Sequence, residues 1–488
     1  MTSLPDDRLP TGFVVRLGPT VRVRDGGRTL IGGDMGGVLY LTPLAAGLVG
    51  DDGMVTVRDG ATAALCRLLL DRGFGAPWWP GDAGRDDGVD DVTVVVPVRD
   101  RPRQLARLLS HLLSDVRVVV VDDGSRDRAA CARVASRAGA TVMTHAVSRG
   151  PAAARNTGLA AAATPLVAFV DSDVVPMAGW LAGLRRHFAD PAVALVGPRV
   201  LGLPPGDGDS WIVRYEAVGS SLDLGRAPAG VRPHALVSYL PAACLMARTT
   251  ALGDGFDPGM RVAEDVDLVW RLVDDGWRVR YAPDVVVRHE HRTTATAWLE
   301  RKAFYGTGAS LLAQRHGTAV APMVLTSWTA LFCAALVAQR RWSVPMAAAV
   351  FGVLVGRIRA RLGHSGDPLR TAVLLAALGV NAALRQTAAA LVRHYWPAAA
   401  LAALCWPRAR RALVVAAAAD AILDHRARAP DLDPLRYLLA RRLDDLAYGA
   451  GLWAGAARAG SIRALLPAVR GLGPARRVGA ARAASPAR

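Results

Sequence analysis

The alternation of apolar and polar positions divides the first 88 residues into short strands and helices. The stretch "FVVRLGPTVRVRDGGRTLIGG" alternates with a period of two and breaks at glycine pairs, which is typical of small antiparallel strands. "TPLAAGLVGDDG" and "DGATAALCRLLLDRGF" have helical spacing, and Thr42 and Asp59 are the expected helix starts. The Pro-, Gly- and Asp-rich segment "PWWPGDAGRDDG" then predicts a linker that closes a small α+β domain at residue 88.

Residues 89–315 alternate continuous apolar runs with helical patterns. "VTVVVPV", "VRVVVVDDGS" and "PLVAFVDSDVVP" predict three strands, and "RQLARLLSHLL", "RAACARVASRAG" and "GPAAARNTGLAAAA" predict the helices between them. Such alternation favours an α/β domain with a mostly parallel, Rossmann-like sheet. Strands that are apolar throughout indicate that helices cover both faces of the sheet.

Residues 316–488 form an apolar and basic helical region. No charge occurs from Thr318 to Ala338, and about 20 such residues can span a bilayer as one helix. Shorter apolar runs, "VPMAAAVFGVLVG", "TAVLLAALGV" and "LVVAAAA", alternate with Arg-rich pieces and suit a soluble bundle or interfacial helices equally. We therefore expect membrane association, with an Ala-rich helical domain as the alternative. The basic tail "PARRVGAARAASPAR" is predicted to be disordered.

The composition narrows the class of partner. The chain has 488 residues and a formal net charge of +17, which favours anionic partners such as nucleotides or lipid head groups. Neither an aromatic-and-basic RNA motif nor zinc-finger spacing is visible, so nucleic acid is not expected as a partner. The five cysteines are far apart and form no C-x-x-C pair, which suits a reducing compartment. No apolar signal segment follows Met1, and the expected location is the cytoplasm or the cytoplasmic face of the cell membrane.

Acidic residues follow each of the three predicted strands. In a parallel sheet the carboxyl ends of the strands meet at one edge, where ligands bind. The charged residues at these ends are Asp100 and Arg101, then Asp122 and Asp123, then Asp171 and Asp173. In an extended segment residues i and i+2 point the same way, so the D-x-D pair can face one ligand. Carboxylate oxygens suit Mg²⁺ or Mn²⁺, and magnesium is often shared with substrate phosphates.

These motifs, in this order, resemble a known enzyme family. "VVVPVRD", "VVVVDDGS", "GPAAARNTG", "FVDSDVVP" and "VAEDVDLVWRL" are similar to the motifs of inverting, family-2 glycosyltransferases with the GT-A fold. The resemblance implies a UDP- or GDP-hexose donor and a Mn²⁺ or Mg²⁺ ion. It implies the following roles: Asp122 and Asp123 at the nucleobase and ribose, Arg149 near the diphosphate, Asp173 on the metal, and Asp171 at the ribose or the metal.

The segment "AEDVDLVWRL" supplies a further carboxylate. Glu264, Asp265 and Asp267 open a predicted helix, and acids near a helix N-terminus are favourable without any catalytic role. Inverting transfer needs one carboxylate to accept the proton of the attacking hydroxyl, and the family pattern assigns this role to Asp265. The resemblance also makes His289, in "VVVRHEHRTT", a candidate third metal ligand. "FYGTG" lacks the Q-x-x-R-W pattern of processive polysaccharide synthases.

A narrower resemblance extends over the whole chain. "SWIVRYEAVGSSLDLG", "VSYLPAACLMAR" and "RHEHRTTATAWLERKAFYGTGA", with the two flanking regions, resemble the glycosyltransferases of the mycofactocin system. The resemblance implies transfer of glucose units in β linkage to premycofactocin, a small acceptor derived from a ribosomally made peptide. The helix pair of residues 1–88 is also similar to small winged-helix modules that recognise peptides, which implies contact with a peptide or the acceptor.

Two other functions stay open at this point. The apolar region of residues 316–488 suits a transferase whose acceptor is a polyprenyl phosphate or a cell-wall glycan. A non-catalytic scaffold that binds a peptide through residues 1–88 would need none of the carboxylates, yet all of them are present. The sequence therefore favours an enzyme over a scaffold.

Overall fold

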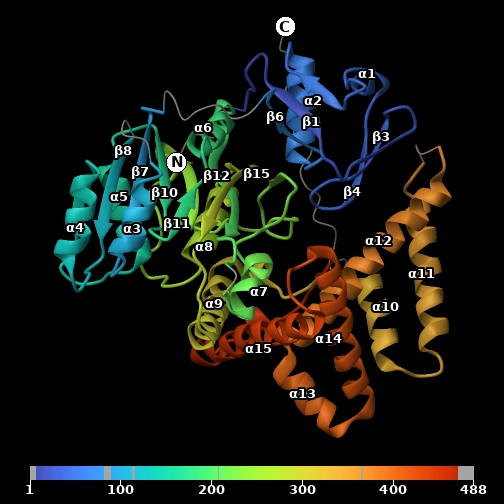
Figure 1. Cartoon of the computed structure of the whole chain (residues 1–488). Coiled ribbons are helices and arrows are strands. Elements are labelled where there is room, and N and C mark those ends of the chain that lie inside the picture. Colours follow the sequence, from blue (N-terminus) through green and yellow to red (C-terminus); the bar gives the residue numbers. More distant parts are fainter. Residues whose placement is uncertain (1–6, 82–88, 113–115, 207, 364–365, 471–488) are drawn as a thin grey trace. The chain divides into compact units, whose positions relative to one another are not determined.

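The computed structural model describes residues 7–81, 89–112, 116–206, 208–363 and 366–470 (Figure 1). They form two compact units. The first consists of Met1–Val320, His364–Gly366 and Ala421–Ala464, and the second of Ala321–Gly363, Asp367–Asp420 and Leu465–Arg488. The predicted boundary at residue 316 thus differs from the observed division, because Ala421–Ala464 joins the first unit. Most of the predicted linker (82–88) and the predicted tail (474–488) lie outside the described residues.

The N-terminal module contains two antiparallel three-stranded sheets, in the orders β5-β1-β6 and β2-β3-β4, and two helices. Its elements are β1 (Val14–Leu17), β2 (Arg22–Arg24), β3 (Thr29–Gly32), β4 (Gly37–Tyr40), α1 (Pro43–Gly47), β5 (Met54–Thr56), α2 (Gly60–Asp71) and β6 (Gly75–Trp78). Both predicted helix starts are confirmed: Thr42 accepts a hydrogen bond from the Ala45 amide at 3.2 Å, and Asp59 from Thr62 at 2.9 Å. Such caps satisfy amides that the first helical turn leaves unpaired. The likeness to winged-helix modules stays a prediction.

The central sheet has nine strands in the order β11-β15-β12-β14-β10-β7-β8-β9, with β13 beside β15. They are β7 (Val92–Val98), β8 (Arg117–Asp122), β9 (Thr141–Thr144), β10 (Leu166–Val170), β11 (Val174–Pro176), β12 (Val193–Gly202), β13 (Ala229–Gly230), β14 (Cys244–Arg248) and β15 (Arg278–His289). The predicted α/β class is confirmed, with β7, β8, β9 and β10 mutually parallel. The sheet is mixed, because β14 begins at the carboxyl end of β10 and runs back between β10 and β12.

Helices cover both faces of this sheet, as the apolar strands predicted (Figure 1). Along β7, Val94 and Val96 belong to one core and Val95 to the other, since successive side chains of a strand alternate in direction. The first core packs against α3 (Pro102–Leu109), α4 (Arg128–Arg137) and α6 (Trp180–Arg185), and the second against α5 (Pro151–Ala161) and α8 (Glu264–Asp274).

A buried ion cluster ties the N-terminal module to the sheet. Arg67 of α2 donates two hydrogen bonds of 2.8 Å to the carboxylate of Asp190, which is completely buried and also pairs with Arg280 of β15. Arg278 of the same strand pairs with Asp71 at 2.7 Å. Paired, bidentate arginine–carboxylate contacts fix orientation as well as distance. The module is therefore held in a defined position on β15.

Two long helices of the first unit, α9 (Ala295–His316) and α15 (Pro434–Arg458), pack with their backbones in close contact. A Cβ atom on Gly451 would lie 1.8 Å from the carbonyl oxygen of Ala303, so only glycine fits there. Nearby, the Lys302 ammonium lies 2.9 Å from carboxylate oxygens of both Glu216, in α7 (Trp211–Gly219), and Asp444. This buried network holds the segment that follows β15.

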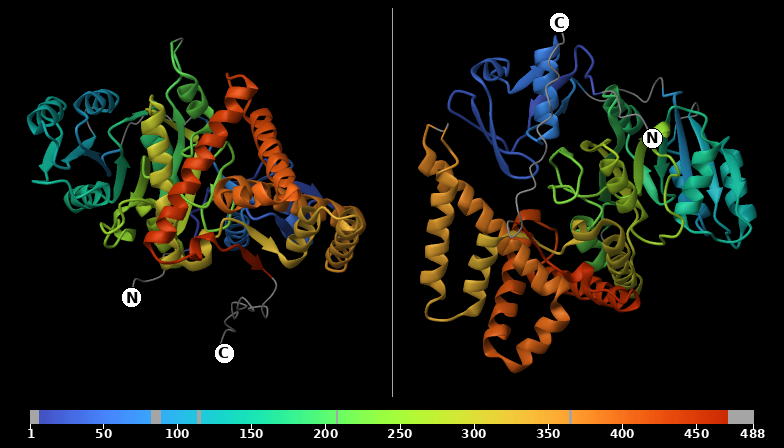
Figure 2. Two further views of the ribbon diagram at one scale, coloured as in Figure 1. Left: turned by 90° about the horizontal axis from the view of Figure 1, so that it is seen from below. Right: turned by 180° about the vertical axis from the view of Figure 1, so that it is seen from behind.

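The second unit is mainly helical (Figure 2). It contains β16 (Val324–Thr326), α10 (Ser327–Ala338), α11 (Ser343–Arg359), α12 (Pro368–Ala389), η4 (Ala390–His394), α13 (Trp396–Cys405), most of α14 (Pro407–Arg428), and β17 (Ala468–Arg470). The expectation of one spanning helix from Thr318 to Ala338 is wrong, because a 3-10 turn and β16 interrupt that stretch. Within the described residues one other helix, Pro368–His394, is long and apolar enough to cross a membrane. Core helices of soluble proteins pass the same test.

Candidate active site

The D-x-D pair lies in the turn between β10 and β11. The sequence predicted one extended strand through this segment, but the Val174 amide bonds back to the Asp171 carbonyl at 3.0 Å and reverses the chain. The predicted extended backbone of this segment is therefore wrong, and it no longer supports the expectation that both carboxylates face one ligand, since i and i+2 share a direction only in extended backbone. Asp171 and Asp173 contact different partners.

Asp173 is buried and lies beside His289. The antiparallel register of β11 and β15 places Val174 opposite His289, which brings the imidazole Nε2 to 3.4 Å from an Asp173 carboxylate oxygen. Arg101, which follows β7, pairs with the other oxygen. Burial would raise the pKa of Asp173, but the contacts with His289 and Arg101 outweigh it and lower the pKa well below its ordinary value. The Asp173 side chain is therefore ionised at neutral pH.

Asp171 belongs to a second ion cluster, centred on Arg155 of α5. The Arg155 guanidinium donates to Asp171 at 2.7 Å and to Glu264, at the start of α8, at 2.9 Å. Burial acts to lower the pKa of Arg155, and the two carboxylates together raise it. The side chain of Asp171 is 31% exposed, whereas that of Arg155 is almost fully buried. Arg155 thus connects the D-x-D turn to the start of α8.

Asp265 lies next to Glu264 at that helix start. Its two carboxylate oxygens accept hydrogen bonds from the backbone amides of Ala242 at 3.0 Å and Val266 at 2.9 Å. Burial and the neighbouring charge of Glu264 raise the pKa of Asp265 to about 6. A carboxylate with a pKa near 6 is ionised at neutral pH and still basic enough to take a proton. By contrast, Asp267 is fully buried and pairs with Arg271 and His316 as a structural residue.

Asp122 and Asp123 stabilise the loops at the ends of β8 and β9. Asp122 is buried and accepts from the Ser125 amide at 3.0 Å. Asp123 accepts four hydrogen bonds of 2.7–2.9 Å, from the His145 ring, the Ser148 hydroxyl, and the backbone amides of residues 149 and 150. Its four lone-pair positions are therefore in use. The predicted contacts of both aspartates with a nucleotide stay predictions.

Arg149 lies on the loop before α5, where its backbone amide bonds to Asp123 and its side chain is exposed. Its predicted approach to a diphosphate also stays a prediction. The structure adds two exposed arginines, Arg292 and Arg301, that the sequence analysis did not name. Partial desolvation and the positive charges of Arg101 and Arg301 lower the pKa of Arg292, so these three cations lie near one another.

Arg301 donates to the hydroxyl of Tyr305 at 3.0 Å, and its guanidinium lies 4.8 Å from the centre of that ring. Although desolvation opposes it, Tyr305 and the carboxylates of Asp171 and Asp173 raise the pKa of Arg301. Four guanidinium groups, those of Arg101, Arg155, Arg292 and Arg301, therefore lie around the D-x-D turn. The sequence signal for Arg155 is its place in "GPAAARNTG", whereas Arg292 and Arg301 lie in "RHEHRTTATAWLERKAFYGTGA", which indicates no role for either.

Asp173 and His289 offer a carboxylate oxygen and an imidazole nitrogen to a divalent cation. The Nδ1 atom of His289 is buried and has no hydrogen-bond partner among the described residues. Within that part of the chain, no three His, Cys, Asp or Glu side chains group closely enough to enclose a metal ion. Magnesium is commonly held by one or two carboxylates together with substrate phosphates, so two protein ligands fit an ion shared with a diphosphate. Asp171 bonds to Arg155 and does not join Asp173 and His289 as a third ligand.

The chain is similar to known glycosyltransferases. The family model "Glycosyl transferase family 2" matches residues 93–233, and "Glycosyl transferase family group 2" matches residues 166–384. A pre-mycofactocin glycosyltransferase of Mycobacterium tuberculosis is 45% identical over 478 residues, which cover 95% of this chain and 99% of that protein. An uncharacterized glycosyltransferase of Mycobacterium bovis is 32% identical over 192 residues, 39% of this chain and 82% of that protein.

Solved structures also resemble this chain. A mannosyltransferase from Pyrobaculum calidifontis, in complex with GDP-Man and Mn²⁺, is 22% identical, covers 63% of this chain and 90% of its own, and has a TM-score of 0.37. The sequence relatives carry the assignment, because the first of them is similar over nearly the whole length. This chain belongs to glycosyltransferase family 2 and is a glycosyltransferase.

Proposed function

We propose that this glycosyltransferase moves glucose from a UDP- or GDP-sugar to premycofactocin. The identity of the acceptor is inferred from one observation, the similarity to a pre-mycofactocin glycosyltransferase at 45% identity over 95% of the chain. That similarity includes the N-terminal module and the helical second unit as well as the central sheet. A transferase that shared only its donor site with this relative would match over the central domain alone.

The GT-A arrangement belongs to the same proposal. Its support is the parallel group β7, β8, β9 and β10, with acidic residues beyond the carboxyl ends of β7, β8 and β10. Ligands of open α/β sheets bind at this edge. The guanidinium groups of Arg101, Arg292 and Arg301 lie beside the D-x-D turn. They would bind the oxygens of a diphosphate, since one guanidinium can donate two parallel hydrogen bonds to a phosphate.

The metal ligands in this proposal are Asp173 and His289, with Mn²⁺ or Mg²⁺ as the ion. A bound divalent cation would offset the negative charge that the diphosphate gains as it departs. Arg101 already neutralises Asp173 in the present structure, so an ion and Arg101 would compete for one oxygen. Asp171, held by Arg155, is left to contact the ribose.

Asp265 is the general base. In inverting transfer the oxygen of the acceptor hydroxyl bonds to the anomeric carbon while the bond from that carbon to the diphosphate breaks. The hydroxyl proton passes to a carboxylate oxygen of Asp265, and the diphosphate leaves with the bonding electrons. The backbone amides of Ala242 and Val266 fix the orientation of this carboxylate.

The activity is expected to fall as the pH drops through about 6, the pKa of Asp265. Above that pH the carboxylate is ionised and accepts the proton. Below it the carboxyl group is protonated, so kcat/KM should decrease by about tenfold for each pH unit. Initial rates between pH 5 and 8, at constant ionic strength and metal concentration, test this. A flat profile through pH 6 would show that a different group accepts the proton.

The acceptor is tested by incubating the full-length enzyme with a radiolabelled donor and either premycofactocin or a polyprenyl phosphate. We expect label in premycofactocin and none in the lipid. The lipid acceptor is the second candidate because the helix Pro368–His394 is long and apolar enough to reach a bilayer. Label in the lipid alone would replace the proposed acceptor. Label in neither, with no binding of the donor, would restore the peptide-binding scaffold.

The proposal keeps two expectations for the flanking regions. The N-terminal module contacts the acceptor, and the second unit brings the enzyme to the cytoplasmic face of the membrane. The membrane location is supported by the apolar helix Pro368–His394, because only 22% of its most apolar stretch is buried. Four of the five cysteines are buried and none forms a disulfide, which suits a reducing compartment.

A further inference from the structure

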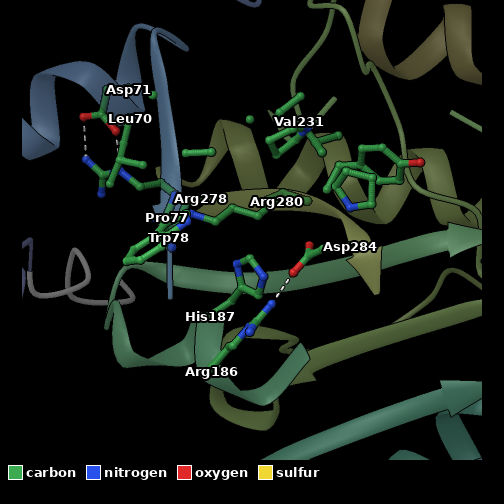
Figure 3. Close-up of a pocket in the computed structure, with 18 of the residues that line it drawn as sticks. Leu70, Asp71, Pro77, Trp78, Arg186, His187, Val231, Arg278, Arg280 and Asp284 are labelled. Atoms are coloured by element: carbon green, nitrogen blue, oxygen red, sulfur yellow. Dashed lines mark hydrogen bonds and ion pairs between the residues drawn. The ribbon is translucent and has the colours of Figure 1, made fainter. Parts of the chain in front are cut away.

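A cavity of about 690 Å³ lies where the N-terminal module meets the central sheet (Figure 3). Its walls come from the end of α2, from β6, from β13 and from the first half of β15. Both sides belong to the first compact unit. Pockets for small molecules typically have volumes of about 300–1,000 Å³, so this cavity has the size of a ligand site.

The cavity is far from the transfer site. From the beginning of β15, residues 278–281, 283 and 284 line it, whereas His289 ends that strand. Arg280 pairs with Val196 and His289 with Gly202 on the neighbouring strand β12, and a strand rises about 3.3 Å per residue, so Arg280 and His289 lie about 20 Å apart along the sheet. None of the residues assigned to donor, metal or base lines the cavity. A molecule bound here would therefore not occupy the donor site.

The walls are rich in arginine. Six guanidinium groups line the cavity, from Arg186, Arg199, Arg226, Arg232, Arg278 and Arg280. Four of them form ion pairs with carboxylates: Arg186 with Asp284, Arg199 with Asp223, Arg278 with Asp71, and Arg280 with Asp190. For the other two, Arg226 and Arg232, the described part of the chain contains no carboxylate within ion-pair distance. Arg232 donates one hydrogen bond of 2.8 Å to the Asp71 carbonyl and its charge acts on Asp34, but its Nε has no acceptor there.

Several buried nitrogens of the same wall lack an acceptor. His187 is 4% exposed, and neither ring nitrogen has a hydrogen-bond partner within the described ranges. Its ring lies between Arg186 and Arg280 (Figure 3). Burial and the charge of Arg280 hold the pKa of His187 well below its ordinary value, so the ring is neutral. The Nε atoms of Arg186 and Arg232 and one terminal nitrogen of Arg280 are also unpartnered. Arginine nitrogens only donate, so the wall selects acceptors.

Aromatic rings supply the apolar part of the cavity. Trp78, Trp79, Trp277 and Tyr281 all contribute to the lining. Trp79 is already engaged, with the Arg186 guanidinium 4.5 Å above its ring and the His187 ring 4.6 Å away. Trp78 and Trp277 are partly buried, with no ring contact recorded in the described structure. Indole rings and guanidinium groups that line one cavity suit a ligand that has both a flat ring and an anionic end.

We propose that this cavity binds a small molecule in which a carboxylate or a phosphate is joined to a flat ring. The anionic end lies against Arg226 and Arg232, and the ring lies against the tryptophans. Two sources share this chemistry: a nucleotide, such as the nucleoside diphosphate that the transfer releases, and a peptide-derived aromatic carboxylate. The inference depends on binding and not on the identity of the transferred sugar.

Calorimetric titration of the full-length protein tests it with three probes: UDP, the dipeptide glycyl-phenylalanine, and inorganic phosphate. The test variant is Arg226→Gln with Arg232→Gln. The matched control is Arg16→Gln with Arg22→Gln, which changes two exposed arginines of the module outside the cavity. Turnover at saturating substrate should be unchanged in both variants, which shows that each is folded.

For a nucleotide ligand, we expect two UDP sites per wild-type chain and one in the test variant. For a carboxylate ligand, glycyl-phenylalanine binds the wild type and the control equally and the test variant at least tenfold more weakly. If phosphate binds as tightly as both ring compounds, the ring has no role and the proposal is wrong. The proposal also fails if neither ring compound shows this binding at millimolar concentration, or if the test variant binds like the control. Loss of transfer activity with the cavity site intact would instead count against the proposed function.

Discussion

Replacing Asp265 with asparagine is expected to lower kcat by about 10²- to 10⁴-fold, the range that general base catalysis contributes. The amide has nearly the shape of the carboxylate, but it cannot accept a proton from the attacking hydroxyl. Asparagine can keep only one of the two hydrogen bonds that the Ala242 and Val266 amides donate to Asp265, because its NH2 group only donates, so the fold of the variant is measured as well. Steady-state rates together with far-UV circular dichroism measure both effects. The decline of activity below pH 6 should also disappear in the residual rate.

The matched control is Asp275→Asn, which removes an exposed carboxylate at the other end of the same helix. We expect near-native kcat for this variant, because Asp275 contacts neither Arg155 nor the D-x-D turn in the described hydrogen bonds. If Asp265→Asn keeps near-native turnover, the assignment of the base is incorrect. A loss of the same size in Asp275→Asn would point to damage to α8 instead of to catalysis.

Asp173→Asn is expected to weaken Mn²⁺ binding so far that activity at ordinary Mn²⁺ concentration is lost. Removing residues that only orient metal ligands typically costs 10- to 100-fold in metal affinity, so loss of a direct ligand should cost at least about 100-fold. The variant should therefore need far more Mn²⁺ for half-maximal activity, and kcat/KM at ordinary Mn²⁺ should fall to background. Activity titrated against Mn²⁺, and Mn²⁺ binding in the presence of UDP, measure this change.

Asp171→Asn separates the two aspartates of the D-x-D motif. Asp171 is proposed to contact the ribose, so its loss should weaken binding of the donor. Because its carboxylate bonds to Arg155 and not to the metal, the Mn²⁺ concentration for half-maximal activity should stay within a few-fold of the wild type. A large change in the Mn²⁺ response of Asp171→Asn, with no change in that of Asp173→Asn, would show that Asp171 holds the metal instead.

Local features of the fold could be predicted from the sequence because neighbouring residues determine them. The run "VTVVVPV" coincides with β7, Val92–Val98, since continuous β-branched residues suit a strand buried on both faces. Thr42 and Asp59 cap their helices by accepting hydrogen bonds from backbone amides only three residues further along the chain. The positions of the carboxylates at the strand ends follow from the same local reasoning.

Contacts between distant segments could not be predicted in this way. The pair Arg155–Glu264 joins residues 109 apart, and the proximity of His289 to Asp173 depends on the register of β11 with β15. The sequence predicts an extended strand through "FVDSDVVP", because the apolar residues on both sides hide the tight turn at Asp171. The uncharged stretch after Thr318 has the composition of a spanning helix, but the pairing of β16 with β17, more than 140 residues later, interrupts it.

Inverting transfer of glucose to premycofactocin is tested by the anomeric configuration of the product. The wild-type enzyme is incubated with an α-linked nucleoside diphosphate glucose, Mn²⁺ and premycofactocin, and the isolated product is examined by proton NMR. We expect a β-linked glucose on premycofactocin, formed by the wild type and not by Asp265→Asn. An α-linked product would contradict it, as would transfer to a polyprenyl phosphate with premycofactocin left unmodified.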